Sequence, residues 1–198
     1  MSRLVHALLV ATATICLVAP SASANPNNRL GGTLGDLWTT VLQTPTPDNP
    51  FTEGGNPCVD LGDMLAPFGP NGVESCTVER GTKIFAAAWT TECSTFEGNG
   101  STEAELRACA RAADAGITTH TIAVDGQSVP VSEVETELLT IHLPKDNIFG
   151  FTGAERNGLS VGHGWVTLLD SLTPGTHTID IHVAGTVNLD VTTTIIVL

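Results

Sequence analysis

The chain has 198 residues, with 8 basic and 21 acidic side chains, and therefore a net charge of −13 at neutral pH. This charge disfavours binding to nucleic acids and to anionic membrane surfaces, because their phosphates attract clusters of Lys and Arg. The length suits one ordinary domain with its own hydrophobic core.

The first segment, residues 1–24, has the pattern of a secretory signal peptide. Arg3 precedes an apolar run from Leu4 to Val18, and the segment ends in the small residues Ala22-Ser23-Ala24 that signal peptidase cuts. The run is too short to cross a bilayer with a hydrocarbon core of about 30 Å. We therefore expect a protein that is secreted into the extracellular or periplasmic space after cleavage near Ala24, with no membrane anchor.

Four cysteines remain after this cleavage. An even number in an oxidising compartment predicts disulfides. Three pairings are possible, and the simplest joins Cys58 to Cys76 and Cys93 to Cys109. Each bond of this loop size should add about 3 kcal/mol to the free energy of unfolding. A zinc site is the alternative, but no pair has the short spacing of zinc motifs.

Residues 25–80 are predicted to form an irregular lead-in that contains the first disulfide, because Pro, Gly and Asn recur throughout them. From Gly81 the character of the sequence changes, and residues 81–198 are predicted to form the main β domain. Its first strand is the run Ile84–Trp89, which is apolar on both faces as a central strand would be.

One helix is predicted over about residues 102–115. Thr102 and Glu105 form a capping box at its start. The apolar stripe at helical spacing is Leu106, Cys109, Ala110 and Ala113. The charged residues, Asp114 among them, are assigned to the opposite side. A disulfide from the stripe to the end of the first strand would hold this helix against the sheet.

The rest of the chain has the pattern of short strands separated by turns. The candidate strands are residues 117–124, 137–143, 164–169, 176–183 and 187–197. Asp125-Gly126, between the first two of them, is a strong hairpin signal. Turns between short strands favour an antiparallel sandwich.

Several motifs resemble those of known exported proteins. They are Ser75-Cys76-Thr77-Val78, Glu92-Cys93-Ser94, Glu105 to Ala110, Gly164-Trp165 and the hairpin from Ser171 to Ile181 around Pro174-Gly175. In this order, over residues 49–198, they resemble a family of secreted bacterial proteins of unassigned function. The resemblance implies an immunoglobulin-like antiparallel β-sandwich with one inserted α-helix and two disulfides. It supplies no catalytic residues, and it places an acidic residue where this chain has His163.

Residues 158–162 match the G-x-S-x-G pattern that surrounds a nucleophilic serine, and His163 follows them. That pattern works on a strand-to-helix turn, whereas a strand is expected after Ser160. We therefore favour a chance match in a glycine-rich loop. The alternative is an extracellular serine hydrolase that uses Ser160 and His163.

Glu133, Glu135 and Glu137 alternate along the chain, so a strand would project their carboxylates to one side. They would begin a calcium site, since Ca²⁺ takes six to eight oxygen ligands. A solvated strand edge protected by charge is the commoner arrangement. Apart from calcium, the sequence indicates no cofactor.

On this basis the sequence favours an exported, non-catalytic binding or interaction module over an enzyme. It carries strand and disulfide signals without a convincing catalytic constellation. The expected partner is an extracellular protein or a glycan, and its identity stays open. The serine hydrolase and a calcium-stabilised adhesion module are the alternatives.

Overall fold

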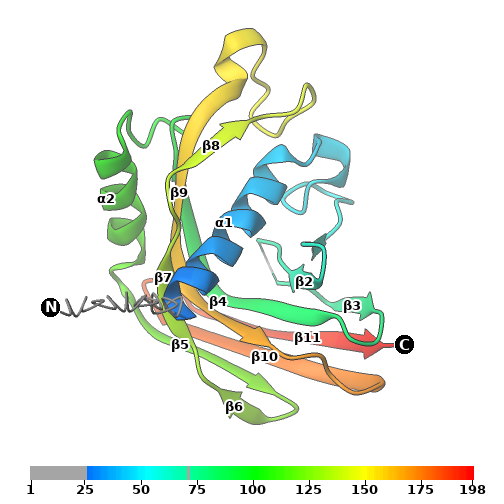
Figure 1. Cartoon of the computed structure of the whole chain (residues 1–198). Helices are drawn as coiled ribbons and strands as arrows, with labels where there is room; N and C mark the ends of the chain where they lie inside the picture. The colour runs from blue at the N-terminus through cyan, green and yellow to red at the C-terminus, as the bar shows by residue number, and fades with distance from the viewer. Residues whose placement is uncertain (1–25, 71) are drawn as a thin grey trace, which may run out of the picture.

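The computed structural model describes residues 26–70 and 72–198 (Figure 1). The expected signal peptide, residues 1–24, lies outside these residues. The described chain is mainly β, as predicted, and its two sheets and two disulfides fit a β-sandwich. It has two α-helices, where one was predicted. None of its helices is long and apolar enough to cross a membrane.

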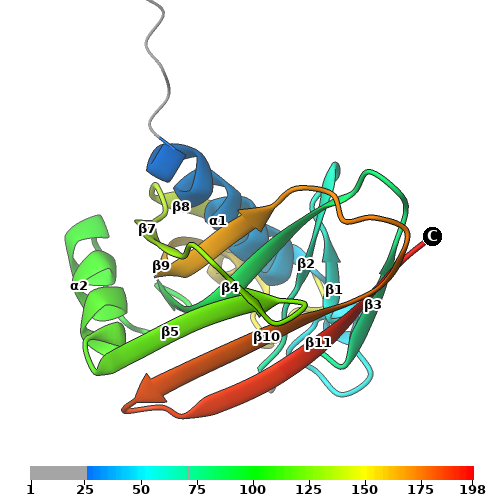
Figure 2. The same ribbon diagram turned by 90° about the horizontal axis from the view of Figure 1, so that it is seen from below.

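The first sheet has the strand order β1-β2-β4-β9-β7, and β8 also pairs with β9. Its strands are β1 (Cys58–Asp60), β2 (Met64–Pro67), β4 (Lys83–Ser94), β7 (Ser132–Glu135), β8 (Leu139–His142) and β9 (Asn157–Leu169). The second sheet has the order β3-β11-β10-β5-β6. Its strands are β3 (Ser75–Val78), β5 (Ile117–Val124), β6 (Gln127–Val129), β10 (Gly175–Gly185) and β11 (Leu189–Val197). Figure 2 shows β5, β10 and β11 side by side. Two 3-10 turns, η1 (Thr46–Asp48) and η2 (Gly153–Arg156), lie in the connections.

The helix α1 (Pro26–Gln43) stands where the sequence predicted an irregular lead-in, so that prediction was wrong for this segment. Its three glycines lower the helix propensity, since Gly costs about 1 kcal/mol relative to Ala in a helix. Packing overrides this cost. The residues that α1 buries against the first sheet include Leu34, Leu37, Trp38 and Val41. Gly31 also lets α1 approach β7 closely, because a Cβ there would lie 2.6 Å from the Glu135 carbonyl oxygen.

The helix α2 (Glu103–Asp114) lies across the first sheet from α1 (Figure 1). Its capping box forms as predicted, since the Thr102 hydroxyl accepts from the Glu105 N–H and the Glu105 carboxylate accepts from the Thr102 N–H. Hydrogen bonds to this carboxylate, that of the Ser101 N–H foremost, lower the pKa of Glu105 to about 2. The capping box therefore sets the start of α2 that the sequence predicts.

The two disulfides have the predicted pairing. Cys58–Cys76 joins β1 to β3 and so connects the two sheets. Cys93–Cys109 joins the end of β4 to α2. Each bond therefore links two layers of the fold rather than two neighbouring strands.

The glycine-rich start of β9 belongs to the strand, although the sequence placed the strand start at Gly164. A Cβ at Gly162 would lie 2.6 Å from the Trp38 ring, and one at Gly164 would lie 2.3 Å from the Trp89 carbonyl oxygen. These glycines therefore allow close packing inside a sheet. The predicted strand 137–143 is shorter in the structure, as β8, and β7 lies before the predicted range.

A bulge in β4 decides which side chains face which layer. The register against β9 shifts between Ala87 and Trp89, so Ala88 is the extra residue. Before the bulge, Ile84 and Ala86 face the core between the sheets. After it, the odd-numbered residues from Trp89 onward face that same side of the sheet, because one inserted residue reverses the alternation.

The disulfide between β4 and α2 provides a test of this architecture. Replacing Cys93 and Cys109 together by serine should lower the free energy of unfolding by about 3 kcal/mol, because the bond closes a loop of sequence separation 16. Urea denaturation followed by circular dichroism measures the loss. The double serine variant at Cys58 and Cys76, with separation 18, is the matched control and should lose a similar amount. A loss below about 1 kcal/mol in both variants would contradict the expectation.

Candidate functional site

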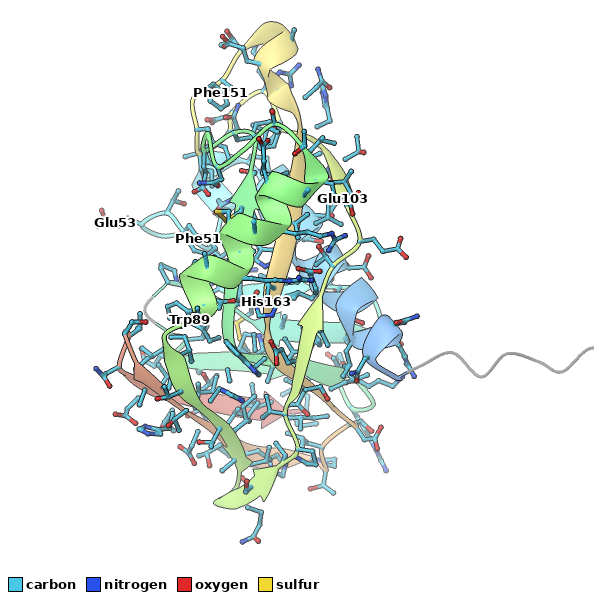
Figure 3. All side chains as sticks on the ribbon, turned by 90° about the vertical axis from the view of Figure 1, so that its left-hand side faces the viewer. Phe51, Glu53, Trp89, Glu103, Phe151 and His163 are labelled. Atoms are coloured by element: carbon cyan, nitrogen blue, oxygen red, sulfur yellow. A yellow bond between two sulfur atoms is a disulfide. The ribbon has the colours of Figure 1, made fainter. Side chains whose placement is uncertain are left out.

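His163 is the centre of a buried polar cluster between β9 and α2. Only 6% of its surface is exposed, and Figure 3 shows it with Trp89 near the C-terminal end of α2. Its Nδ1 lies 2.7 Å from Asp114 Oδ2, and its Nε2 lies 3.1 Å from Glu133 Oε1. Carboxylate oxygens only accept hydrogen bonds, so both ring nitrogens donate and the imidazolium form fits this environment. The hydrogen bond to Asp114 is the main cause that raises the pKa of His163.

Asp114 is the acceptor that holds the cluster together. It is 1% exposed. Its Oδ1 accepts from Trp89 Nε1 at 2.8 Å and from Thr91 Oγ1 at 2.6 Å, while Oδ2 contacts His163. A buried carboxylate is stable only when its lone pairs are satisfied, and here three donors satisfy it. The imidazole is therefore fixed in orientation by a carboxylate that is itself fixed.

The sequence assigned Asp114 to the exposed side of the helix, and the structure contradicts this. Asp114 follows Ala110 by four residues and Leu106 by eight, and both of those residues are buried. It therefore continues the buried stripe, whereas Ala113, which was expected on that stripe, is exposed. A carboxylate in register with the apolar stripe was the signal that could have identified this residue.

Ser160 and His163 are not brought together. Both lie in β9 and stand three residues apart, so their side chains project from opposite faces of the sheet. Ser160 is fully buried and donates its hydroxyl to the Glu92 carboxylate. A nucleophilic serine needs a base within hydrogen-bond reach on its own side. The Ser160–His163 pair required by the hydrolase alternative is therefore not formed.

Glu92 is a second titratable group that the sequence analysis missed. It lies in β4 on the face opposite the His163 cluster. Burial raises the pKa of Glu92 to about 7, and the hydrogen bond from Ser160 opposes this effect only in part. In the sequence Glu92 looks like an ordinary polar position near a strand end, so only its three-dimensional surroundings reveal the shift.

Glu133, Glu135 and Glu137, the residues considered for a calcium site, do not form one cluster of ligands. Glu133 contacts His163, while the Glu135 carboxylate forms ion pairs with Arg107 at 2.7 Å and Arg111 at 2.9 Å. Glu137 lies beyond the end of β7. Within residues 26–70 and 72–198, no group of three His, Cys, Asp or Glu side chains is placed to hold a metal ion.

An apolar cavity of about 270 Å³ lies next to the His163 cluster, between α1, β4 and the second sheet. Its described lining residues are Trp38, Phe51, Pro67, Phe68, Gly69, Pro70, Gly72, Val73, Ala87, Ala88, Trp89, Thr90, Ile181, Leu189, Val191 and Thr193. None of these residues carries a charge. The Phe51 side chain is 39% exposed, so the cavity reaches the surface beside it.

The aromatic wall of this cavity is packed and held in place. The Phe68 ring lies edge-on to Trp38 at 5.2 Å and to Phe51 at 5.6 Å. Trp38 Nε1 donates to the Thr90 hydroxyl at 3.1 Å, and that hydroxyl donates to the His163 carbonyl oxygen. Trp89 lines the cavity too, while its Nε1 is bound to Asp114. The cavity and the His163 cluster therefore share Trp89.

Comparison with known proteins finds no protein-family model and no curated protein that match this chain. Among solved structures, the solution structure of Amebosin is similar to it at 11% identity and a TM-score of 0.25, over 68% of this chain and 96% of that chain. A TM-score this low supports no statement about fold or function.

Titration of Glu92 should make the protein less stable as pH rises. The folded state has a pKa of about 7 at Glu92 against 4.5 for an unperturbed group, so it binds more protons than the unfolded state between these values. Stability from this group is complete below pH 4.5 and is lost as pH rises through 7. The raised pKa of His163 acts in the same direction, from about 6.5 upward.

The variant Glu92→Gln keeps an acceptor for Ser160 and removes the titration. Relative to the wild type, it should gain on the order of 3 kcal/mol at pH 8 and almost nothing at pH 4.5, since each pKa unit corresponds to about 1.4 kcal/mol. Urea denaturation at both pH values measures the difference. Glu137→Gln, at an exposed position, is the control. An equal effect of Glu92→Gln at both pH values would refute the assignment.

Asp114→Asn should lower the pKa of His163 and destabilise the fold. The loss should be about 3 kcal/mol at pH 6, because one partner of a buried ion pair is removed, and smaller at pH values above the pKa of His163, where the imidazole is neutral. NMR titration of the His163 ring and urea denaturation measure the two effects. Asp190→Asn is the matched control, since Asp190 bonds His182 at 2.6 Å on the exposed face and should contribute less than about 1 kcal/mol.

Proposed function

We propose that the protein is an exported, non-catalytic binding module and that the apolar cavity is its binding site. The observation that carries this proposal is the cavity itself. Small-molecule sites are usually concave and lined mainly by apolar and aromatic side chains with a few polar groups, as this cavity is. An apolar cavity of about 150 Å³ stays dry and binds benzene. A cavity of about 270 Å³ therefore has room for a molecule of one or two rings.

The arrangement of the titratable groups favours binding over catalysis. Nε2 of His163 is engaged with Glu133, and the hydroxyl of Ser160 lies on the other face of β9. A serine hydrolase would need these two groups in contact. The calcium-stabilised alternative is disfavoured in turn, because Glu135 is already neutralised by two arginines.

Export is supported by the chemistry of the cysteines together with the leader pattern of residues 1–24. Disulfides persist in oxidising compartments, and both pairs are formed. Membership of a family of secreted bacterial proteins stays part of this proposal. The ligand we propose is an extracellular small molecule, since the cavity suits one better than a protein or glycan surface.

Filling the cavity tests the proposal. The Ala87 side chain lines the cavity, so Ala87→Leu should occupy part of its volume. We expect 2-naphthol to bind the wild type with a Kd on the order of 100 μM, as is usual for a ligand of about ten heavy atoms, and to bind the variant at least tenfold more weakly. Isothermal titration calorimetry measures both constants.

Ala123→Leu is the matched control, because Ala123 lies on the outer face of the second sheet beside Asp180. It adds the same side chain away from the cavity and should leave the Kd unchanged. If Ala87→Leu bound 2-naphthol as tightly as the wild type does, the cavity would not be the binding site.

A further inference from the structure

Thr193 places a hydroxyl where the inner face of β11 is otherwise apolar. Along β11, Val191 and Ile195 point to the same side, and Ile195 and Val197 belong to the core between the sheets. Thr193 is 2% exposed and lines the cavity. Among the described residues, the fully buried side-chain groups that lack a hydrogen-bond partner belong to Thr46, Ser94 and His120, and the Thr193 hydroxyl is not one of them. A hydroxyl on the wall of a cavity that reaches the surface can form hydrogen bonds with whatever occupies the cavity, water or a ligand.

We infer that this hydroxyl is the polar contact for the ligand, and that the ligand is an uncharged molecule of two-ring size that carries a hydroxyl or carbonyl group. This inference rests on the proposed function, since it names the class of molecule that the same cavity binds. A threonine supplies both a donor and an acceptor, so it accommodates either group. Valine has the same shape but offers no hydrogen-bonding group to a ligand.

A second source of hydrogen bonds borders the cavity at the edge of β4. The strand β2 pairs with β4 only at Met64–Lys83 and Leu65–Ile84. Beyond Ile84 no strand of the described chain pairs with β4 on the side away from β9, and Ala87 to Thr90 of this stretch line the cavity. Alternate residues of a strand edge turn their N–H and C=O groups outward. This edge therefore offers main-chain groups to a ligand in the same cavity.

The lack of charge in the lining argues for a neutral ligand. No described lining residue is ionisable in the neutral pH range, and moving a charge from water into an apolar site is strongly unfavourable without a partner. Asp114, whose carboxylate binds the lining residue Trp89, already accepts from Trp89, Thr91 and His163. The net charge of −13 would further disfavour an anionic ligand.

Three probes of equal ring size and one variant test the inference. The probes are 2-naphthol, 2-methylnaphthalene and 2-naphthoate, which carry a hydroxyl, a methyl and a charged group on the same rings. We expect the wild type to bind 2-naphthol about tenfold more tightly than 2-methylnaphthalene, the usual size of one hydrogen bond, and to show no measurable binding of 2-naphthoate. In Thr193→Val the preference for 2-naphthol should disappear, while 2-methylnaphthalene binds at least as tightly as before.

Thr193→Ser keeps the hydroxyl and is the control that should retain the preference. If Thr193→Val does not fold, Thr193→Ala replaces it as the variant without the hydroxyl. Equal affinity for 2-naphthol and 2-methylnaphthalene in the wild type would overturn the role of Thr193 while leaving the cavity as a binding site. Tightest binding of 2-naphthoate would overturn the neutral ligand class. Failure of all three probes to bind would overturn the proposed function as well.

Discussion

The bulge at Ala88 is the constraint on which the other features depend. β4 and β9 form the long central ladder of the first sheet, from Ile84 opposite Leu169 to Ser94 opposite Ser160. With strict alternation, Thr90 and Glu92 would face α2, and Cys93 would point to the α1 side. The inserted residue reverses this, so Cys93 reaches the helix and Glu92 does not. One extra residue therefore makes both the disulfide and the His163 cluster possible.

The two faces of this ladder carry titratable groups whose pKa values are raised for different reasons. His163 has its pKa raised by carboxylate partners that favour the charged form. Glu92 has its pKa raised by burial that disfavours the charged form. An acid and a base thus retain protons in the folded state through opposite environments. One face of the ladder therefore carries a charged His163 with hydrogen-bonded partners, and the other carries Glu92, whose charged form is disfavoured by burial.

Local rules were sufficient for part of this structure. The capping box at Thr102, the Asp125-Gly126 hairpin and the disulfide pairing depend on residues near one another in sequence, and all three form. The sequence did not predict α1 or the glycine-rich start of β9, because both are stabilised by tertiary packing. The glycines of α1 and β9 indicate loops by propensity, yet each group serves a close approach between layers.

The candidate site could be predicted only in fragments. His163 and Glu133 were both singled out, but for separate sites, and nothing in the sequence indicates that they contact each other. Asp114 follows from helical periodicity once the buried stripe is extended by one turn. The bulge in β4 cannot be predicted in the same way, because the register of β4 depends on its pairing with β9. The cavity lining is likewise drawn from segments far apart in the chain.

If the cavity binds a ligand as proposed, Trp89 gives the His163 cluster a role that does not require catalysis. An aspartate that orients a histidine is the usual mark of an active site, but here the same aspartate also holds the indole N–H of a residue in the cavity wall. Fixing a wall in the binding-competent geometry reduces the entropy that a ligand must otherwise remove on binding. Asp114, Thr91 and His163 then act as the support that keeps Trp89 in position. On this view, the feature that most resembles catalytic machinery is the part of the structure that makes the cavity rigid.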